Sequence, residues 1–318
     1  MKSKKTALVT GCTGQDGSLM CKSLLKKQWK VIGLSREEKN DVINHTKIGI
    51  SKKVEIEKCE ITDQKKFIKL LLKYQPDEIY NLAAQSSVGK SFQEPSETFK
   101  SIVQGTINIL EACRKTNYLG RIFFAGSSEI FGCTDKAANI KHPKNPVSPY
   151  GISKKTSMEL VELYRDIYNL KCCTGVLFNH ESILRDERFV IKKIIKNALQ
   201  AKINKGHIFS LGNINIIRDW GLAEEYVEAM QVLNRSKKIK DDVICTGKQT
   251  SLKCLIKEIF NSLNLNWKDH VKLENSLFRA HDIIKSYGDP TSMYKKHGWI
   301  AKTKSNGLIR KLIDHEIK

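Results

Sequence analysis

The chain has 318 residues, 40% of them hydrophobic, enough to bury a sizeable core in one large domain with a smaller one attached. Lysine and arginine total 55 against 34 acidic residues, giving a net charge of +21. The lysines are spread along the whole chain without interleaved aromatic residues. This favours a solvated surface and an anionic small-molecule ligand, with no nucleic acid partner.

No stretch approaches the roughly 20 apolar residues that a membrane span needs, so we expect no membrane partner. The first residues run directly into an expected strand without the apolar core of a signal peptide, which predicts a cytoplasmic protein. The nine cysteines show no Cys-x-x-Cys spacing and fall mostly inside helix or strand patterns. We therefore expect buried free thiols and no metal site.

Short apolar runs alternate with helical segments over the first half of the chain. Periodic helical patterns such as residues 67–72 and 107–112 separate the runs. The alternation is typical of an α/β protein built on a Rossmann-type doubly wound parallel sheet, with helices on both faces. Strands are expected at residues 7–9, 31–34, 54–56, 78–82, 122–124 and 173–178.

After about residue 179 the pattern changes to short strands and helices separated by polar loops. This change predicts a smaller α+β substrate-binding domain. We expect the nucleotide-binding domain at residues 1–178, with residues 214–248 returning to it, and the substrate domain at residues 179–213 and 249–318.

A glycine-rich turn follows the first expected strand. Gly11, Gly14 and Gly17 form a G-x-x-G-x-x-G pattern that opens a helical segment. The glycines allow a tight turn and close backbone approach, and the helix N-terminus offers free N–H groups to a pyrophosphate. The pattern therefore predicts a dinucleotide site.

The choice between NAD and NADP depends on the residues after the second expected strand. Ser35 and Arg36 favour the 2′-phosphate of NADP, whereas Glu37 and Glu38 are the residue type that binds the 2′-hydroxyl of NAD. We expect NADP, with NAD as the alternative.

Two hydroxyls and a carboxylate, on Ser127, Ser128 and Glu129, follow the apolar run at residues 122–124. Glu129 either points into solvent or serves a buried site, because an unpaired buried carboxylate is costly. Downstream, Tyr150 and Lys154 lie four residues apart and share one helical face. The lysine is expected to lower the tyrosine pKa, which would make Tyr150 a base for an alcohol oxidised by hydride loss to a nicotinamide.

At this point the chain resembles the extended short-chain dehydrogenase/reductases, and within them the GDP-mannose 4,6-dehydratases. The resemblance covers nearly the whole chain. Its most diagnostic parts are Leu-Phe-Asn-His-Glu-Ser and Arg-Asp-Trp-Gly. The segments that carry it are residues 10–18, 75–86, 127–132, 177–182, 218–221 and 288–291.

The resemblance implies a reaction in three stages on one bound cofactor. Tyr150, supported by Lys154 and beside Ser127, helps to oxidise the hexose C4 hydroxyl to a ketone. Glu129 then removes the proton next to the ketone and assists loss of the C6 hydroxyl as water, and the stored hydride returns to C6. Ser127, Glu129, Tyr150 and Lys154 are thus the expected catalytic residues.

The resemblance also implies the ligand contacts. His180 could equally be a hydrogen-bonded core residue. The expected cofactor-binding residues are Gly11, Cys12, Thr13, Gly14, Gln15, Asp16, Gly17, Arg36, Glu60, Ile61, Leu82, Ala83, Ala84, Gln85, Ser86, Tyr150, Lys154, His180 and Arg185. The expected substrate-binding residues are Ser86, Ser127, Ser128, Glu129, Asn179, Val190, Lys193, Arg218, Arg279 and Asp282.

Some details leave alternatives open. The loop after the second strand, which helps to build a tetramer in the relatives, is shortened, so the expected oligomer is a homodimer or a homotetramer. The substrate is a GDP-sugar, either GDP-mannose or a relative such as a GDP-heptose. The alternative functions are a GDP-sugar 4-epimerase, 4-dehydrogenase or 4-keto reductase, which need no Glu129, and a non-catalytic dinucleotide-binding protein.

Overall fold

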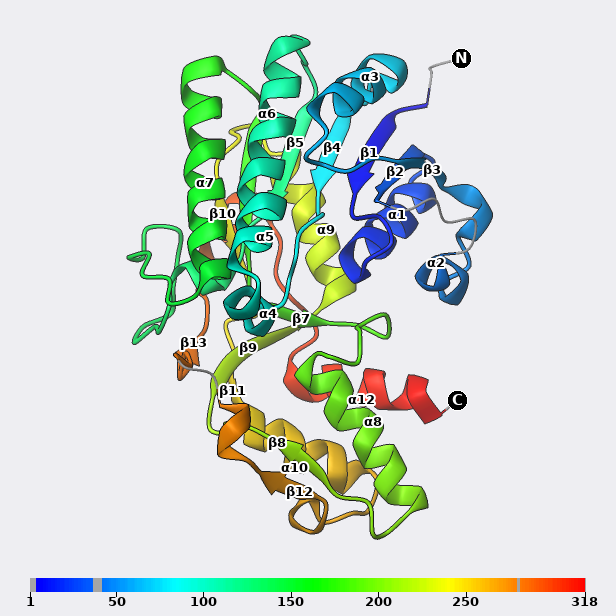
Figure 1. Cartoon of the computed structure of the whole chain (residues 1–318), viewed down its shortest axis with the longest axis vertical. Helices are drawn as coiled ribbons and strands as arrows, with labels where there is room; N and C mark the ends of the chain where they lie inside the picture. Colours follow the sequence, from blue (N-terminus) through cyan, green and yellow to red (C-terminus); the bar gives the residue numbers. More distant parts are fainter. Residues whose placement is uncertain (1–3, 37–41, 279–280, 318) are drawn as a thin grey trace.

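In this computed structural model the largest sheet contains seven parallel strands (Figure 1). The structure describes residues 4–36, 42–278 and 281–317. All six strands expected from the apolar runs are present, and the predicted parallel sheet is confirmed. In spatial order the strands are β10 (Asp242–Ile244), β6 (Cys172–Leu177), β5 (Arg121–Ala125), β4 (Glu78–Asn81), β1 (Thr6–Thr10), β2 (Lys30–Ser35) and β3 (Glu55–Lys58).

Helices cover both faces of this sheet because successive strand residues point to opposite sides. Leu8 packs in one core with α3 (Gln64–Tyr74), α6 (Gly105–Lys115) and α7 (Pro149–Tyr168). Its neighbours Ala7 and Val9 pack in a second core with α1 (Gln15–Lys26) and α9 (Ala223–Asn234). The sheet is therefore doubly wound.

The strand order reverses between β1 and β4, which lie side by side although two strands separate them in the sequence. In such sheets the connections leave on opposite faces at this point and open a crevice outside the carboxyl ends of the strands. The glycine-rich turn follows β1 directly, so the fold places it at that crevice.

A second region is built on two smaller sheets and a core of its own (Figure 1). Strand β9 pairs with β7, β11 and β13, and β8 pairs with β12. Large side chains of β9, α8 and α10, such as Trp220 and Phe260, fill this core. The strands are β7 (Asn179–Glu181), β8 (Phe209–Leu211), β9 (Ile217–Leu222), β11 (Gln249–Ser251), β12 (Val271–Leu273) and β13 (Lys285–Ser286), and the helices are α8 (Val190–Ile203), α10 (Leu252–Ser262) and α12 (Ser305–Ile317).

The two regions interleave along the chain. Strand β9 belongs to the second region, and α9 and β10 return to the large sheet. Met293 and Trp299 also pack in the core beneath α1 and α9. The domain division at residues 178, 213 and 248 remains a prediction. The remaining short helices are α2 (Ile43–Lys47), α4 (Val88–Gln93), α5 (Pro95–Phe99) and α11 (Thr291–His297).

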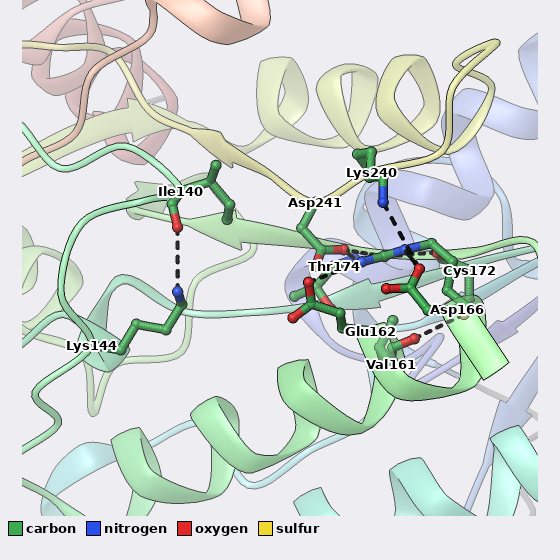
Figure 2. Close-up of polar contacts among 10 residues, drawn as sticks. Ile140, Lys144, Val161, Glu162, Asp166, Cys172, Thr174, Lys240 and Asp241 are labelled. Carbon is green, nitrogen blue, oxygen red and sulfur yellow. Dashed lines mark hydrogen bonds and ion pairs between the residues drawn. The ribbon is translucent and has the colours of Figure 1, made fainter.

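A buried ion pair fastens the end of α7 to the edge of the sheet. Both oxygens of the Asp241 carboxylate accept hydrogen bonds from the Arg165 guanidinium, at 2.7 and 3.2 Å. Asp241 also accepts the backbone N–H of Thr174 at 2.7 Å, and Arg165 donates to the Cys172 carbonyl at 3.1 Å. Figure 2 shows these contacts between α7, β6 and the start of β10. Because α7 begins one residue before Tyr150, this pair holds the helix that carries two of the expected catalytic residues, Tyr150 and Lys154.

All nine cysteines are free thiols and seven are buried, as expected. Within the described ranges, no group of His, Cys, Asp or Glu side chains is arranged to hold a metal ion. Nor does that part of the chain contain a helix long and apolar enough to cross a membrane.

Candidate active site

The glycine-rich turn has the geometry of a phosphate cradle. Gly11 adopts a φ of +64°, and a Cβ there would lie 2.9 Å from the backbone of Ala83. A Cβ on Gly17 would collide with the Gly11 carbonyl oxygen. The Gly14 N–H donates to that same oxygen at 3.0 Å and closes the turn. Only glycine fits at Gly11 and Gly17, so the backbone can come close to a ligand here.

The first turn of α1 is open to an anion. Its N-cap is Gly14, and no side chain in the described part of the chain caps the helix. The N–H groups of a helix's first turn have no partner inside the helix and carry the positive end of its dipole. This cradle therefore fits the diphosphate of a dinucleotide.

Thr10, the last residue of β1, joins the cradle to the end of β4. Its hydroxyl donates to the Asn81 side chain at 2.7 Å and accepts the backbone N–H groups of Leu82 and Ala83, both at 3.1 Å. This arrangement places Leu82 and Ala83 beside the glycine turn. The other expected cofactor residues after β4, Ala84, Gln85 and Ser86, follow them directly in the chain.

The other expected cofactor residues beside β1 lie at the ends of the next strands. Arg36 is exposed directly after β2. Glu60 is exposed and Ile61 is buried shortly after β3, where the Ile61 carbonyl accepts from Asn108 at 3.3 Å. Glu37 and Glu38, which leave the NAD alternative open, lie outside the described residues.

Asp16 and His180 form an ion pair between the start of α1 and β7. The His180 Nε2 lies 2.9 Å from the Asp16 carboxylate, and its Nδ1 lies 2.7 Å from the Phe178 carbonyl oxygen. Burial alone would raise the Asp16 pKa, but His180 and Gln15 outweigh it and lower that pKa to about 2. For His180, Asp16 outweighs the effect of burial and raises the pKa. Because a carboxylate and a carbonyl oxygen face its two ring nitrogens, the site favours the protonated form of His180 beside the cradle.

Neighbouring contacts strengthen this connection. Gln15 accepts from the Ser182 hydroxyl at 3.0 Å and donates to the His180 carbonyl at 3.3 Å. The Arg185 guanidinium lies 3.7 Å from the centre of the Phe189 ring, and its Nε lies 3.1 Å from the buried Glu181 carboxylate. Burial raises the Glu181 pKa, and Arg185 opposes that rise. The predicted residues Gln15, Asp16, His180 and Arg185 are therefore brought together.

Ser127 and Glu129 lie at the carboxyl end of β5. Ser127 caps a short 3₁₀ turn (Ser128–Ile130) by accepting the Glu129 N–H at 3.3 Å. This turn packs against the start of α7, where a Cβ on Gly151 would lie 2.9 Å from the Glu129 carbonyl oxygen. The glycine therefore permits the close approach of the turn to Tyr150.

Tyr150 is buried among these groups, 8% exposed. Burial raises its pKa to about 12, a hydrogen bond with Ser127 opposes the rise, and the Glu129 carboxylate adds to it. The Tyr150 hydroxyl therefore interacts with both residues at the end of β5.

Lys154 does not act on Tyr150 in the expected way. Its ammonium donates to the Ala125 carbonyl at 2.8 Å and lies 5.7 Å from the centre of the Tyr150 ring. Burial lowers the Lys154 pKa to about 8. The prediction that Lys154 lowers the Tyr150 pKa is wrong for this structure, because burial dominates and the ammonium binds a backbone carbonyl.

The other expected substrate residues, besides those after β4 and β5, are spread along the second region. Asn179 on β7 and Arg218 on β9 belong to paired strands, and Arg218 is buried with its guanidinium donating to the Ile217 carbonyl at 2.9 Å. Val190 begins α8, and the Lys193 ammonium donates to the Ser210 carbonyl at 3.0 Å. Two further candidates come late in the chain: Asp282 is half-buried, and Arg279 lies outside the described residues.

Sequence reasoning missed the support that other residues give to this site. The Tyr226 ring on α9 stacks on His180, with ring centres 4.6 Å apart. Buried Asp219, next to Arg218, accepts the N–H groups of Thr246 and Gly247 at 2.9 and 2.8 Å. The Arg-Asp-Trp-Gly motif contains Asp219, but no sequence signal singles out Tyr226.

Comparison with known proteins gives one consistent family. Residues 8–312 match the family model described as GDP-mannose 4,6 dehydratase. GDP-mannose 4,6 dehydratase 1 of Arabidopsis thaliana is 36% identical, with 100% of this chain and 91% of that protein covered. The GDP-mannose 4,6-dehydratase of Sinorhizobium fredii is 31% identical, with 100% and 98% covered.

Solved structures share the fold. A dTDP-glucose 4,6-dehydratase from Streptomyces venezuelae, with NAD and TYD bound, superposes with a TM-score of 0.87 at 20% identity, covering 98% of this chain and 97% of that one. A UDP-glucose 4-epimerase from Thermotoga maritima superposes with a TM-score of 0.86 at 22% identity, covering 98% of each chain.

Proposed function

Because the chain belongs to the GDP-mannose 4,6-dehydratase family, we propose that it converts GDP-mannose, or a related GDP-sugar such as a GDP-heptose, to the GDP-4-keto-6-deoxy sugar. The protein is a hydro-lyase of this family, and we propose a nicotinamide dinucleotide as its cofactor. The observation that carries the proposal is the meeting of Ser127, Glu129 and Tyr150 beside the phosphate cradle.

The first step is oxidation at C4 of the hexose. A bound nicotinamide dinucleotide would supply the hydride acceptor and later donor, and the positive charge of its oxidised form would favour the Tyr150 phenolate. Tyr150 takes the proton of the C4 hydroxyl, with Ser127 hydrogen-bonded to the same phenol. Burial of the phenol excludes water that would compete for this proton.

Glu129 serves the elimination that follows. A ketone at C4 acidifies the C5 hydrogen, and a positioned carboxylate can remove it as a general base. The same proton then leaves with the C6 hydroxyl as water, and a double bond forms between C5 and C6. The hydride would then return to C6, and Tyr150 would pass to C5 the proton that it took from the C4 hydroxyl. The net change is the loss of one water.

We propose NADP as the preferred cofactor. Arg36 lies exposed directly after β2, where a guanidinium can reach a 2′-phosphate on the ribose. We also propose that Arg218 and Asn179, on the paired strands β9 and β7, contact the guanosine diphosphate, and that the protein forms a homodimer or homotetramer.

The test is product mass. Purified protein is incubated with GDP-mannose and with a GDP-heptose, without a second reductant. A product lighter by the mass of one water supports the dehydratase. A product of unchanged mass with inverted C4 would identify a 4-epimerase, which needs Tyr150 and Lys154 but not Glu129. Stoichiometric change of the dinucleotide would instead identify a dehydrogenase or reductase, and no product from any GDP-sugar would favour a non-catalytic dinucleotide-binding protein.

A further inference from the structure

Two adjacent residues of α2 hold two adjacent carbonyls of the glycine-rich turn. The His45 Nε2 lies 2.8 Å from the Cys12 carbonyl oxygen. The Asn44 side-chain amide donates to the Thr13 carbonyl oxygen at 2.9 Å. Both contacts join segments more than thirty residues apart and reach the turn from the side of α2.

The chemistry of His45 fits this single contact. Its side chain is fully buried, and burial lowers its pKa, so the ring is neutral near pH 7. A neutral ring that faces a carbonyl with Nε2 carries its proton there. Its Nδ1 has no hydrogen-bond partner among the described residues. The hydrogen bond to Cys12 is therefore the polar contact that this buried ring makes.

Fixing a carbonyl also fixes the N–H group on the other side of the same peptide. In a trans peptide the C=O of one residue and the N–H of the next point in opposite directions, and no described peptide bond is cis. The Cys12 carbonyl accepts both His45 and, at 3.0 Å, the Ser18 hydroxyl. The Thr13 N–H is thus directed away from these groups, and within the described chain it donates to no other residue.

The same reasoning applies to the next peptide. Asn44 holds the Thr13 carbonyl, so the Gly14 N–H points the opposite way and donates to the Gly11 carbonyl at 3.0 Å. Asn44 therefore supports the hydrogen bond that closes the turn, and His45 supports the orientation of the Thr13 N–H, which stays available to a ligand.

We propose that Asn44 and His45 are positioning residues for the cofactor's diphosphate: by fixing two peptide planes, Asn44 keeps the turn closed and His45 holds the Thr13 N–H ready for a phosphate oxygen. The proposal rests on the proposed function, because it requires a dinucleotide in the cradle. In this proposal α2 affects cofactor affinity through the glycine-rich turn, without touching the cofactor itself.

The experiment measures dissociation constants by titration calorimetry for NADP⁺ and NAD⁺, and for adenosine 2′-monophosphate, which lacks the diphosphate. His45→Leu removes the donor at similar size, His45→Gln keeps an amide donor at similar reach, and Asn44→Ala removes the second bond. Thr46→Ala is the matched control, because Thr46 is an exposed residue of the same helix and its hydroxyl, among the described residues, bonds to Val42 and Ser51 and not to the glycine-rich turn.

We expect His45→Leu and Asn44→Ala each to weaken binding of the preferred dinucleotide by about 3- to 10-fold, the range for loss of one hydrogen bond. His45→Gln should recover most of the loss, Thr46→Ala should bind like the unmutated protein, and adenosine 2′-monophosphate should bind all variants within about twofold. Unchanged dinucleotide affinity, or an equal loss for adenosine 2′-monophosphate, would overturn the proposal.

If His45→Leu does not fold, Asn44→Ala decides alone, since its side chain is only half-buried. Failure of the unmutated protein to bind either dinucleotide would overturn the proposed function itself, which distinguishes the two failures.

Discussion

The Asp16 carboxylate lies 2.9 Å from Nε2 of His180, while Nδ1 of the same ring lies 2.7 Å from the Phe178 carbonyl oxygen. Both ring nitrogens face acceptors, so only the doubly protonated imidazolium can donate to both. The raised pKa of His180 agrees with this assignment. The pair links the phosphate cradle at the start of α1 to β7, the strand that carries Asn179.

This pair should give stability a particular pH dependence. The folded-state pKa of His180 is raised above 6.5, so its contribution is complete below pH 6.5 and is lost as the pH rises through the raised value. The Asp16 pKa falls from 3.8 to about 2, so its contribution is complete above pH 3.8 and is lost only as the pH falls toward 2.

We therefore expect His180→Gln to lower the free energy of unfolding by about 1.5 to 3 kcal/mol near pH 5.5 and by less near pH 8.5. Urea denaturation of both proteins across this range measures the difference. His315→Gln, an exposed position on α12, is the control. A difference that stays constant with pH would show that the charge on His180 does not matter to folding.

Arg36→Ala tests the cofactor preference. A charge-assisted hydrogen bond to phosphate contributes about 1.5 to 3 kcal/mol, so the unmutated protein should bind NADP⁺ roughly ten- to a hundredfold more tightly than NAD⁺. The variant should narrow this ratio by weakening NADP⁺ alone, whereas Arg310→Ala, at an exposed position on α12, should not. If calorimetric titration gives equal affinities of the unmutated protein for NADP⁺ and NAD⁺, the preference for NADP is rejected.

Asp241→Ala should destabilise the folded protein, although Asp241 is not one of the expected active-site residues. Removing one partner of a buried ion pair leaves the other charge uncompensated and typically costs about 3 to 5 kcal/mol. Asp166→Ala is the matched control, because its carboxylate lies 3.6 Å from the same Arg165 but is 50% exposed. Urea denaturation should show less than about 1 kcal/mol for the control. Equal effects of the two substitutions would contradict the role of the buried pair.

Tyr150→Phe should stop the reaction before any hydride moves. Without the phenol no group accepts the C4 hydroxyl proton, so oxidation at C4 should slow by about 10² to 10⁴-fold. Single-turnover absorbance of the reduced nicotinamide measures this step, with Tyr294→Phe, at an exposed position of α11, as the control. Normal formation of reduced nicotinamide in Tyr150→Phe would remove Tyr150 from the first step.

The local parts of the fold and of the cradle could be predicted because their signals are local. Most of the runs that became β1 to β6 are apolar, and Gly11, Gly14 and Gly17 lie within seven residues of one another. Strand β10 could not be found, since it has three residues and begins with Asp242. Nothing in the sequence indicates that Tyr226 stacks on His180, because tertiary packing alone brings α9 to β7.

The pKa of Tyr150 shows the limit of reasoning from spacing. The four-residue separation from Lys154 placed both side chains on one helical face, as expected, since α7 begins at Pro149. It could not reveal that Tyr150 is buried or that the Lys154 ammonium binds the Ala125 carbonyl. Burial therefore sets the direction of the shift, and a spacing rule that omits burial predicts the opposite sign.

The central claim is that Glu129 is the base of the elimination. Glu129→Gln keeps the size and hydrogen-bonding reach of the side chain but removes its basicity, while Glu162→Gln changes an exposed position of α7 and serves as the control. The decisive measurement is a single turnover in D₂O with a GDP-sugar that the unmutated enzyme consumes, following deuterium at C5 and loss of water by mass. In Glu129→Gln, oxidation at C4 should proceed and reduced nicotinamide should accumulate, while water loss and deuterium incorporation at C5 fall by about 10² to 10⁴-fold. Dehydration by Glu129→Gln at the unmutated rate would contradict the account and favour a 4-epimerase or reductase on this scaffold.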